Sequence, residues 1–446
     1  MKRKLVTALC GTLALAMAVP AFAKDHKISG FFRARFMIEG GRSGGISPNV
    51  AKDFDPQKNV DQRFRAKWTM GLNEYVSLTY YGEVDFVYGD VSYGTHRNDG
   101  GALGGDTVNL ETKNLYLNVK IPDTPVSTRI GLQGFGDHWD FVFVAADMAG
   151  VSVRAKLDSV SLTGIWAKWF EGGSNGDTDE NDVDFWGIQV GFKPMGDLKL
   201  GVDGYYLNVN GDYGGMPTSN SDLYYLGVHA AYKLPMVNLQ GWAFYNFGSM
   251  DAEGKSDADV AAFAASIKGT ASVAGAKVGL RLFYFSGDDD NSDGDVNSAF
   301  LMTSRAENFP FFMDGLMLLT PDKTWTTLGH EGYGFVMAQN QGYGLWGAIL
   351  STAYTPPTMK KMYINLSLGY MSAVEDDRTP GDGSSDREGT TIGTEIAARV
   401  GYKVADIVDV SLNGSYLSLG DFFDKQAGGD DPDNPYTLYA MVNVPF

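Results

Sequence analysis

The residues of this chain that could bind a cofactor form two weak motifs. Gly342-Tyr-Gly344-Leu-Trp-Gly347 has the glycine spacing of a dinucleotide-binding turn, but it opens a strand-like run. The helix N-terminus that holds a pyrophosphate is therefore missing. Asp289 to Gly294 matches the first half of a calcium loop, although Phe300 stands where the bidentate glutamate belongs. We expect a solvated acidic loop at the second motif and no cofactor at either.

The histidines offer little for catalysis. His138 lies between Asp137 and Asp140, which suits an acid–base pair, but no nucleophile accompanies it. A polar side chain lining a pore is the better interpretation of His138. His330-Glu331 lacks the second histidine of a zinc-binding helix motif. With five histidines and a single cysteine, the sequence predicts no enzyme activity, no cofactor and no transition-metal site.

Positive charge gives the most specific functional signal, because it follows one phase of alternating segments. In residues 27–38 and 63–72, apolar side chains occupy one face and cations the other. A cation that faced lipid near the bilayer midplane would cost about 2–4 kcal/mol. The cations are instead expected on a pore wall; they are Arg33, Arg35, Arg63, Arg65, Lys67, Arg129 and Arg154. A structural alternative, compatible with the first, pairs the arginines with Glu83 and Asp85 on the next strand.

The third long connection complements this basic wall. Residues 134–147 are largely apolar, with Phe135, Trp139, Phe141 and Phe143 among them. A loop of this composition would not remain in water, so we expect it to fold into a barrel and narrow the pore. It also carries three acids that would face the cations and create a transverse field; they are Asp137, Asp140 and Asp147.

The elements that must position these residues are strands. Alternating segments of about 9–11 residues recur along the chain, the length a tilted strand needs to cross a bilayer. Short turns alternate with long polar loops, which we place near 39–61, 88–108, 171–182, 209–221, 249–259, 287–341, 373–388 and 418–434. The pattern predicts an all-β, transmembrane, antiparallel up-and-down barrel of about 18 strands, with 16 as the alternative. Segments 263–271 and 345–354 have the least certain phase.

Composition agrees with this architecture. The chain contains 44% hydrophobic residues and has a mean hydropathy of −0.17, and no apolar run after the amino-terminal segment is long enough for a membrane helix. The net charge of −18 becomes −21 once Lys2, Arg3 and Lys4 are removed with that segment. Such acidity disfavours nucleic acid as a partner.

The two ends of the chain indicate export and barrel closure. Residues 1–23 read as a cleavable signal peptide, with a basic start, an apolar run containing Cys10, and Ala21-Phe22-Ala23 as the cleavage site. Residues 24–446 then form a single barrel domain without cysteine. Its last strand ends on Phe446 and would pair with the first strand, because closure removes an exposed edge.

The basic wall, the apolar third loop and the terminal Phe446 resemble those of general-diffusion porins of the Gram-negative outer membrane. The Pro-Glu-Phe-Gly-Gly pattern of enterobacterial third loops is absent. The resemblance implies a homotrimer, contact with outer-membrane lipid and lipopolysaccharide, and a terminal Phe446 that the barrel-assembly machinery reads.

The sequence therefore predicts a water-filled channel for passive diffusion of small hydrophilic solutes and ions. The alternative is a substrate-specific channel, for sugars, organic acids or an export polymer, or the barrel sheath of an outer-membrane electron-transfer conduit. An aromatic ladder would favour sugars, but the aromatic residues in lumen phase look scattered; they are Phe31, Tyr116, Trp242, Phe244, Phe283 and Phe285. The apolar stretch 309–319 would plug the outer mouth or pack against another protomer.

Overall fold

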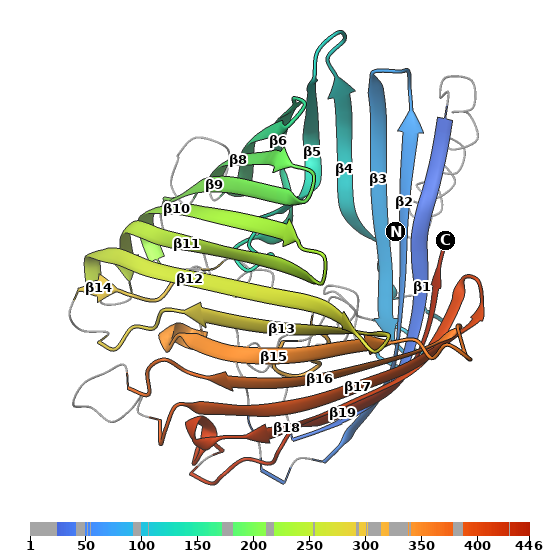
Figure 1. Cartoon of the computed structure of the whole chain (residues 1–446), viewed down its shortest axis with the longest axis vertical. Coiled ribbons are helices and arrows are strands. Elements are labelled where there is room, and N and C mark those ends of the chain that lie inside the picture. The colour runs from blue at the N-terminus through green and yellow to red at the C-terminus, as the bar shows by residue number, and fades with distance from the viewer. Residues whose placement is uncertain are drawn as a thin grey trace.

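The chain folds into one closed antiparallel β-barrel with almost no helix (Figure 1). The computed structural model describes residues 25–446 except 42–49, 51, 54, 92–99, 106, 172–181, 211–217, 253–254, 291–293, 300, 302–313, 321–337, 339, 378–386 and 428. Eighteen strands form the wall, which confirms the predicted number and excludes sixteen. None of the described helices has the length and apolarity needed to cross a membrane. The signal peptide predicted for residues 1–23 lies outside the described residues.

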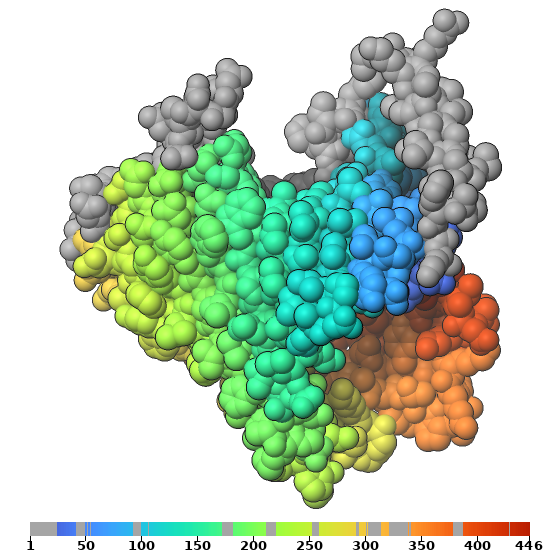
Figure 2. Space-filling model, turned by 90° about the horizontal axis from the view of Figure 1, so that it is seen from above, coloured from blue at the N-terminus to red at the C-terminus, as the bar shows by residue number. Residues whose placement is uncertain are grey.

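The wall strands follow one another around the barrel in chain order, and Figure 2 shows their atoms forming a continuous wall from yellow-green to blue. The two-residue β14 is an extra strand that pairs in parallel with β12. The bounds of the elements are β1 (Asp25–Gly40), β2 (Gln57–Gly71), β3 (Val76–Val87), β4 (Glu111–Lys120), β5 (Val126–Gly136), β6 (Ala145–Lys156), β7 (Val160–Phe170), β8 (Val183–Met195), β9 (Leu198–Val209), β10 (Thr218–Lys233), β11 (Val237–Ala252), β12 (Lys255–Val273), β13 (Ala276–Phe285), β14 (Asp295–Val296), η3 (Asn340–Gly342), β15 (Leu345–Tyr354), β16 (Met362–Ser372), β17 (Thr391–Ala405), β18 (Val408–Leu419), η4 (Asp421–Phe423) and β19 (Tyr436–Pro445).

Pairing of β1 with β19 closes the barrel, so the first and the last strand of the wall lie side by side (Figure 1). Phe446 extends the ladder, since it exchanges backbone hydrogen bonds of 2.8 and 3.0 Å with Gly30. Its ring stacks on Phe64 at a centroid distance of 5.8 Å. The last strand therefore leaves no free edge, as its alternating sequence predicts.

The predicted faces of the strands are confirmed. On β1, Phe36 is 55% exposed on the outer surface, whereas Arg33 and Arg35 are buried on the inner face. The two segments of uncertain phase are now fixed: Phe263 and Trp346 point outward. Apolar side chains thus cover the outside of the barrel, where a bilayer can solvate them, and the inner face holds the polar groups.

The connections alternate in length as expected, with one exception. Turns such as 72–75, 121–125 and 274–275 lie at one end of the strands, and connections such as 88–110 and 286–344 lie at the other. The prediction of a long loop near 249–259 is wrong, because β11 continues to Ala252 and β12 already begins at Lys255. Where a strand projects beyond the membrane, its end consists of polar residues, and this composition resembles that of a loop.

Candidate functional site

The third loop, residues 137–144 between β5 and β6, is held in shape by its own first residue. Asp137 Oδ1 accepts hydrogen bonds from the backbone N–H groups of Trp139 and Phe141, at 2.7 and 2.9 Å. Asp137 Oδ2 accepts from Phe143 and Val144, at 2.9 and 2.7 Å. Burial raises the pKa of Asp137 to about 6, and these four hydrogen bonds oppose the increase. The carboxylate also offsets the cost of left-handed backbone at Asp140 and Phe141.

The third loop folds into the barrel, as predicted, and docks by its aromatic side chains. Trp139 and Phe143 are fully buried. The Trp139 ring stacks on Phe244 of β11 at 4.7 Å, and the Phe143 ring stacks on Tyr225 of β10 at 4.0 Å. Gly227 makes this approach possible, because a Cβ there would lie 2.6 Å from the Trp139 ring.

Four of the six inner aromatic residues that look scattered in the sequence form a continuous cluster in the structure, whereas Phe31 and Tyr116 lie apart, beside Arg65 and Arg129. Trp242 stacks on Phe244, and Phe283 and Phe285 meet edge to face on β13. Strands β8 to β10 add Phe185, Tyr205 and Tyr225, which pack around the third loop. The expectation of scatter is therefore wrong for the four residues of β11 and β13. Since these rings are buried by the third loop, they anchor it and do not form an open ladder for sugars.

Asp140, at the tip of the third loop, pairs with Arg281 of β13, a cation that was not among the predicted site residues. Its Oδ2 accepts from Arg281 Nη1 of β13 at 2.5 Å and from Trp242 Nε1 of β11 at 2.8 Å. Arg281 Nε also donates to Asp314, which pairs with Lys268 of β12 as well. Arg281 is 3% exposed and joins two segments that both enter the lumen.

The second of these segments, residues 314–320, is called the second insert. Its apolar residues Leu316 and Leu319 are fully buried within the barrel. Glu395 of β17 accepts hydrogen bonds of 2.6–3.2 Å from the backbone N–H groups of Met317, Leu318 and Leu319. The expectation that the stretch 309–319 packs against another protomer is therefore wrong for residues 314–319. Residues 309–313 lie outside the described part of the chain.

The cations of the paired strands β1 and β2 form a row, here called the arginine wall: Arg33, Arg35, Arg63, Arg65 and Lys67. Arg33 lies directly across from Arg63 in the β1–β2 register. Arg35 pairs with Asp61 at 2.5 Å. Arg63 pairs with Asp85 and Glu83, and Arg65 with Glu83. The cross-strand pairing proposed as the structural alternative is thus present.

The remaining predicted site residues lie near the base of the third loop. Arg129 and Arg154 line a polar cavity of ≈ 220 Å³ between β4 and β8, together with Gln133 and Gln189. The guanidinium of Arg129 lies over the Tyr116 ring at 5.1 Å. Asp147, at the start of β6, pairs with Lys113 of β4 at 2.9 Å. All three acids of the loop region therefore have partners outside the arginine wall: backbone for Asp137, Arg281 for Asp140 and Lys113 for Asp147.

His138 is 42% exposed, and its hydrogen-bonded carboxylate is neither of the neighbouring aspartates in the sequence. Its Nδ1 lies 3.0 Å from Asp203 of β9, so its carboxylate partner comes from the wall. The hydrogen bond to Asp203 raises the pKa of His138 above its ordinary value. No local motif marks Asp203, and no spacing in the chain links it to the third loop. A signal for Arg281 did exist, since it shares the lumen phase of Phe283 and Phe285 on one strand.

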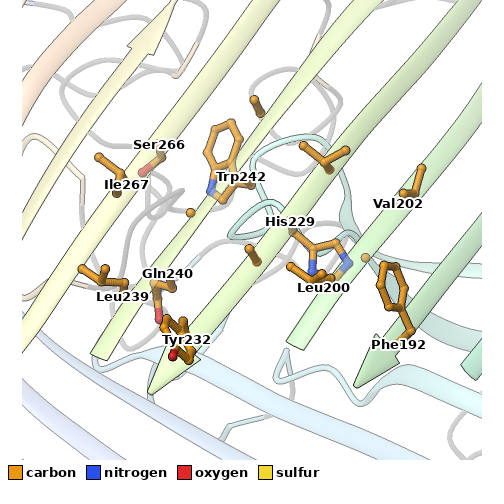
Figure 3. Close-up of a pocket in the computed structure, with 15 residues that line it drawn as sticks. Phe192, Leu200, Val202, His229, Tyr232, Leu239, Gln240, Trp242, Ser266 and Ile267 are labelled. Carbon is orange, nitrogen blue, oxygen red and sulfur yellow. The ribbon is translucent and has the colours of Figure 1, made fainter. Parts of the chain in front are cut away.

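A groove of ≈ 530 Å³ lies over β8 to β12 (Figure 3). Most of its lining residues belong to the outward-facing phase, including Phe192, Val202, Tyr232 and Ile267, which are 38–54% exposed. The groove therefore lies mainly on the lipid-facing surface.

No family model matches the chain, and no curated protein matches it. Its fold is similar to solved outer-membrane porins of the Occ/Opd group. Pseudomonas aeruginosa OccK8 (OprE) is 13% identical, with a TM-score of 0.56 over 95% of this chain and 99% of that one. Acinetobacter baumannii OccAB1 is 12% identical, with a TM-score of 0.57 over 95% and 97%. P. aeruginosa OpdK, solved with vanillate, is 12% identical, with a TM-score of 0.56 over 95% and 99%.

These likenesses concern the fold, since the identities are low. The closed barrel and its apolar exterior support the location in a Gram-negative outer membrane that the sequence predicts. The chain has the fold of an outer-membrane porin.

Proposed function

We propose that this protein is a substrate-specific outer-membrane channel for small organic acids. The observation that carries the proposal is the arginine wall set within a lumen that two inserts narrow. A channel narrowed by inserts with buried anchors selects solutes by contact with its walls as well as by size. The predicted general-diffusion function is the second candidate.

The charge balance of the wall favours anions. Its five cations face four buried acids of β1 to β3, Asp61, Glu83, Asp85 and Glu39, so one positive charge remains in excess. Carboxylate partners hold the guanidinium groups in place, and low-dielectric walls strengthen their field in the lumen. Arg35 and Arg63 are buried in their ion pairs, whereas Arg65 is 20% exposed and can donate hydrogen bonds to a small carboxylate as it passes.

The structural neighbours add support for a selective channel. One of them, P. aeruginosa OpdK, was solved with vanillate, a small aromatic carboxylate. This chain shares their architecture over nearly its whole length. At sequence identities of 12–13%, the likeness concerns the fold, so a small carboxylate as the solute of this chain is part of the proposal.

The test compares two triple variants that change total charge equally. Arg63→Gln, Arg65→Gln and Lys67→Gln remove cations from the wall; Lys193→Gln, Lys199→Gln and Lys233→Gln remove exposed cations at the turn ends of β8 to β10. We expect only the wall variant to move the reversal potential in planar bilayers toward cations and to slow uptake of benzoate into liposomes. Equal behaviour of the wall variant and the wild-type protein would remove the arginine wall from the solute path.

Uptake of graded neutral solutes separates the two candidate functions. A general-diffusion pore passes sugars in order of size at rates comparable to those of organic acids. A selective channel passes benzoate much faster than an uncharged solute of the same size. Rates that depend on size alone would favour general diffusion.

We further propose a homotrimer, on the basis of the resemblance to trimeric porins. Cross-linking and mass determination in detergent test this arrangement. A monomer mass without cross-linked species would contradict it.

A further inference from the structure

Three side chains with metal-binding groups meet where the third loop touches the wall: His138 of the loop, Asp203 of β9 and His229 of β10. His138 Nδ1 lies 3.0 Å and His229 Nε2 lies 3.8 Å from Asp203 Oδ2. The two imidazole rings are 4.6 Å apart. One ligand atom from each of the three side chains falls within 4.8 Å of the others. These residues are 65 and 26 positions apart in sequence, so only the fold assembles them.

The environment of His229 is unusual for a structural histidine. Its Nε2 is buried and has no hydrogen-bond partner among the described residues. The wall makes room for this atom, because a Cβ on Gly201 would lie 2.0 Å from it. Figure 3 shows the His229 ring on β10 and Trp242 on the neighbouring β11. A buried nitrogen without a donor or acceptor carries a free-energy cost, which a bound ligand would relieve.

We propose that His138, Asp203 and His229 form a binding site for a divalent transition-metal ion, with Zn²⁺ as the representative. Two imidazoles and one carboxylate are a common ligand set for Zn²⁺. Bonds of 2.0–2.2 Å in a tetrahedron place ligand atoms about 3.3 Å apart, between the two separations seen here. His138 is 42% exposed, so an ion can enter from the lumen and keep a water or solute as its fourth ligand.

The ion would add a metal-mediated link between the third loop and the wall. Asp140, two residues from His138, already joins the loop tip to Arg281 of β13. Coordination of one ion by His138, Asp203 and His229 would strengthen the contact of the loop with β9 and β10. It would also add positive charge close to Asp137, Arg154 and Tyr205, the titratable groups that face this corner. Metal binding would thus reduce loop motion and alter conduction, an effect that is separate from the solute class proposed above.

The experiment measures Zn²⁺ and Co²⁺ binding to the detergent-solubilised barrel at about pH 7.5, where imidazoles are largely neutral. We compare the wild-type protein with His138→Ala and His229→Ala, and use His26→Ala as a control, because His26 lies outside the cluster and stacks on Trp68. We expect one Zn²⁺ per chain in the wild type and the control. Loss of a residue that only supports a metal ligand weakens metal binding by about 10- to 100-fold. Loss of His138 or His229, which would bind the ion directly, should weaken Zn²⁺ binding by more than this.

Two readouts test the site without relying on affinity alone. The visible spectrum of bound Co²⁺ should show tetrahedral nitrogen and oxygen ligation, and it should vanish in His138→Ala. In planar bilayers, Zn²⁺ should change single-channel conductance in the wild type and in His26→Ala but leave His138→Ala and His229→Ala unchanged. Heat-modifiability on a denaturing gel confirms that each variant forms the barrel.

Equal Zn²⁺ affinity in the wild type and both histidine variants would overturn the proposal, because binding would then reside on the acidic loops. Absence of Zn²⁺ binding to the folded wild type would also overturn it. A conductance that responds to pH in metal-free buffer but not to Zn²⁺ would assign the cluster to proton binding instead. A failure of benzoate selectivity would leave the metal site untouched, so the two proposals fail separately.

Discussion

The third loop and the second insert both enter the barrel and are both held by a buried carboxylate, yet the carboxylates have different origins. Asp137 belongs to the third loop and binds the loop's own N–H groups. Glu395 belongs to β17 and binds the N–H groups of an insert nearly eighty residues away. The third loop carries its fold in its own sequence, whereas the second insert depends on a wall assembled from distant strands.

The two inserts also meet the same side chain. Arg281 contacts Asp140 of the third loop and Asp314 of the second insert. A planar guanidinium with several N–H groups can serve two carboxylates at once, which a lysine ammonium does with less directional control. This difference between a locally folded loop and a wall-dependent insert leads to four predictions.

The largest effect is expected from Arg281→Gln. The substitution leaves Asp140 and Asp314 without their shared cation, and removal of one partner of a buried ion pair costs about 3–5 kcal/mol. Both inserts should loosen, so single-channel conductance should rise and the heat-modifiability temperature should fall. Lys277→Gln, at an exposed end of the same strand, is the control. Unchanged conductance in Arg281→Gln would show that the inserts hold their places without this cation.

Trp139→Ala should disturb the third loop and leave the second insert in place. The buried ring stacks on Phe244, and replacement of a buried Trp by Ala typically costs about 3–5 kcal/mol. Limited proteolysis followed by mass spectrometry should show new cleavage within residues 137–144 but no new cleavage in 314–320. Phe141→Ala, on the more exposed face of the same loop, should have little effect. Cleavage in both inserts would mean that the two are coupled through more than Arg281.

Glu395→Gln should disturb the second insert selectively. The amide presents an N–H group to backbone donors where the carboxylate accepted them, and hydrogen bonds to a charged group contribute about 1.5–3 kcal/mol. Hydrogen exchange should accelerate at Met317 to Leu319 and stay unchanged at Phe143. Glu388→Gln, which breaks an exposed pair with Lys425, serves as the matched control. Slow exchange at the second insert in Glu395→Gln would assign its stability to apolar burial alone.

Asp140→Asn should give the smallest change. The amide oxygen can still accept from Arg281, but the pair loses its charge attraction, worth about 1 kcal/mol or less at a partly exposed site. Arg281 then gains uncompensated positive charge, so the reversal potential should move toward anions while the barrel keeps its heat-modifiability. Asp123→Asn, in a turn between β4 and β5, controls for net charge. A shift of equal size in both variants would place Asp140 outside the conducting path.

Period-two patterning carried most of the fold prediction. A closed barrel surrounded by lipid needs apolar side chains at alternate positions, so the sequence of each strand indicates which face points outward. For β19, this pattern could be followed to the last residue, Phe446. The error at 249–259 has the same origin. Beyond the bilayer both faces of a strand meet water, the alternation disappears, and a strand reads as a loop.

The inward fold of the third loop was also predictable, because an apolar loop cannot remain in solvent. The anchoring role of Asp137 was not predicted, since the sequence analysis placed this acid opposite the cations. The sequence by itself thus determined the barrel, the outer faces and the inward third loop. The tertiary structure alone decided which charges meet. Barrel curvature brings Arg281 to Asp140, Glu395 to the second insert, and His138 to Asp203 and His229, and contacts across a lumen have no period or spacing in the chain to reveal them.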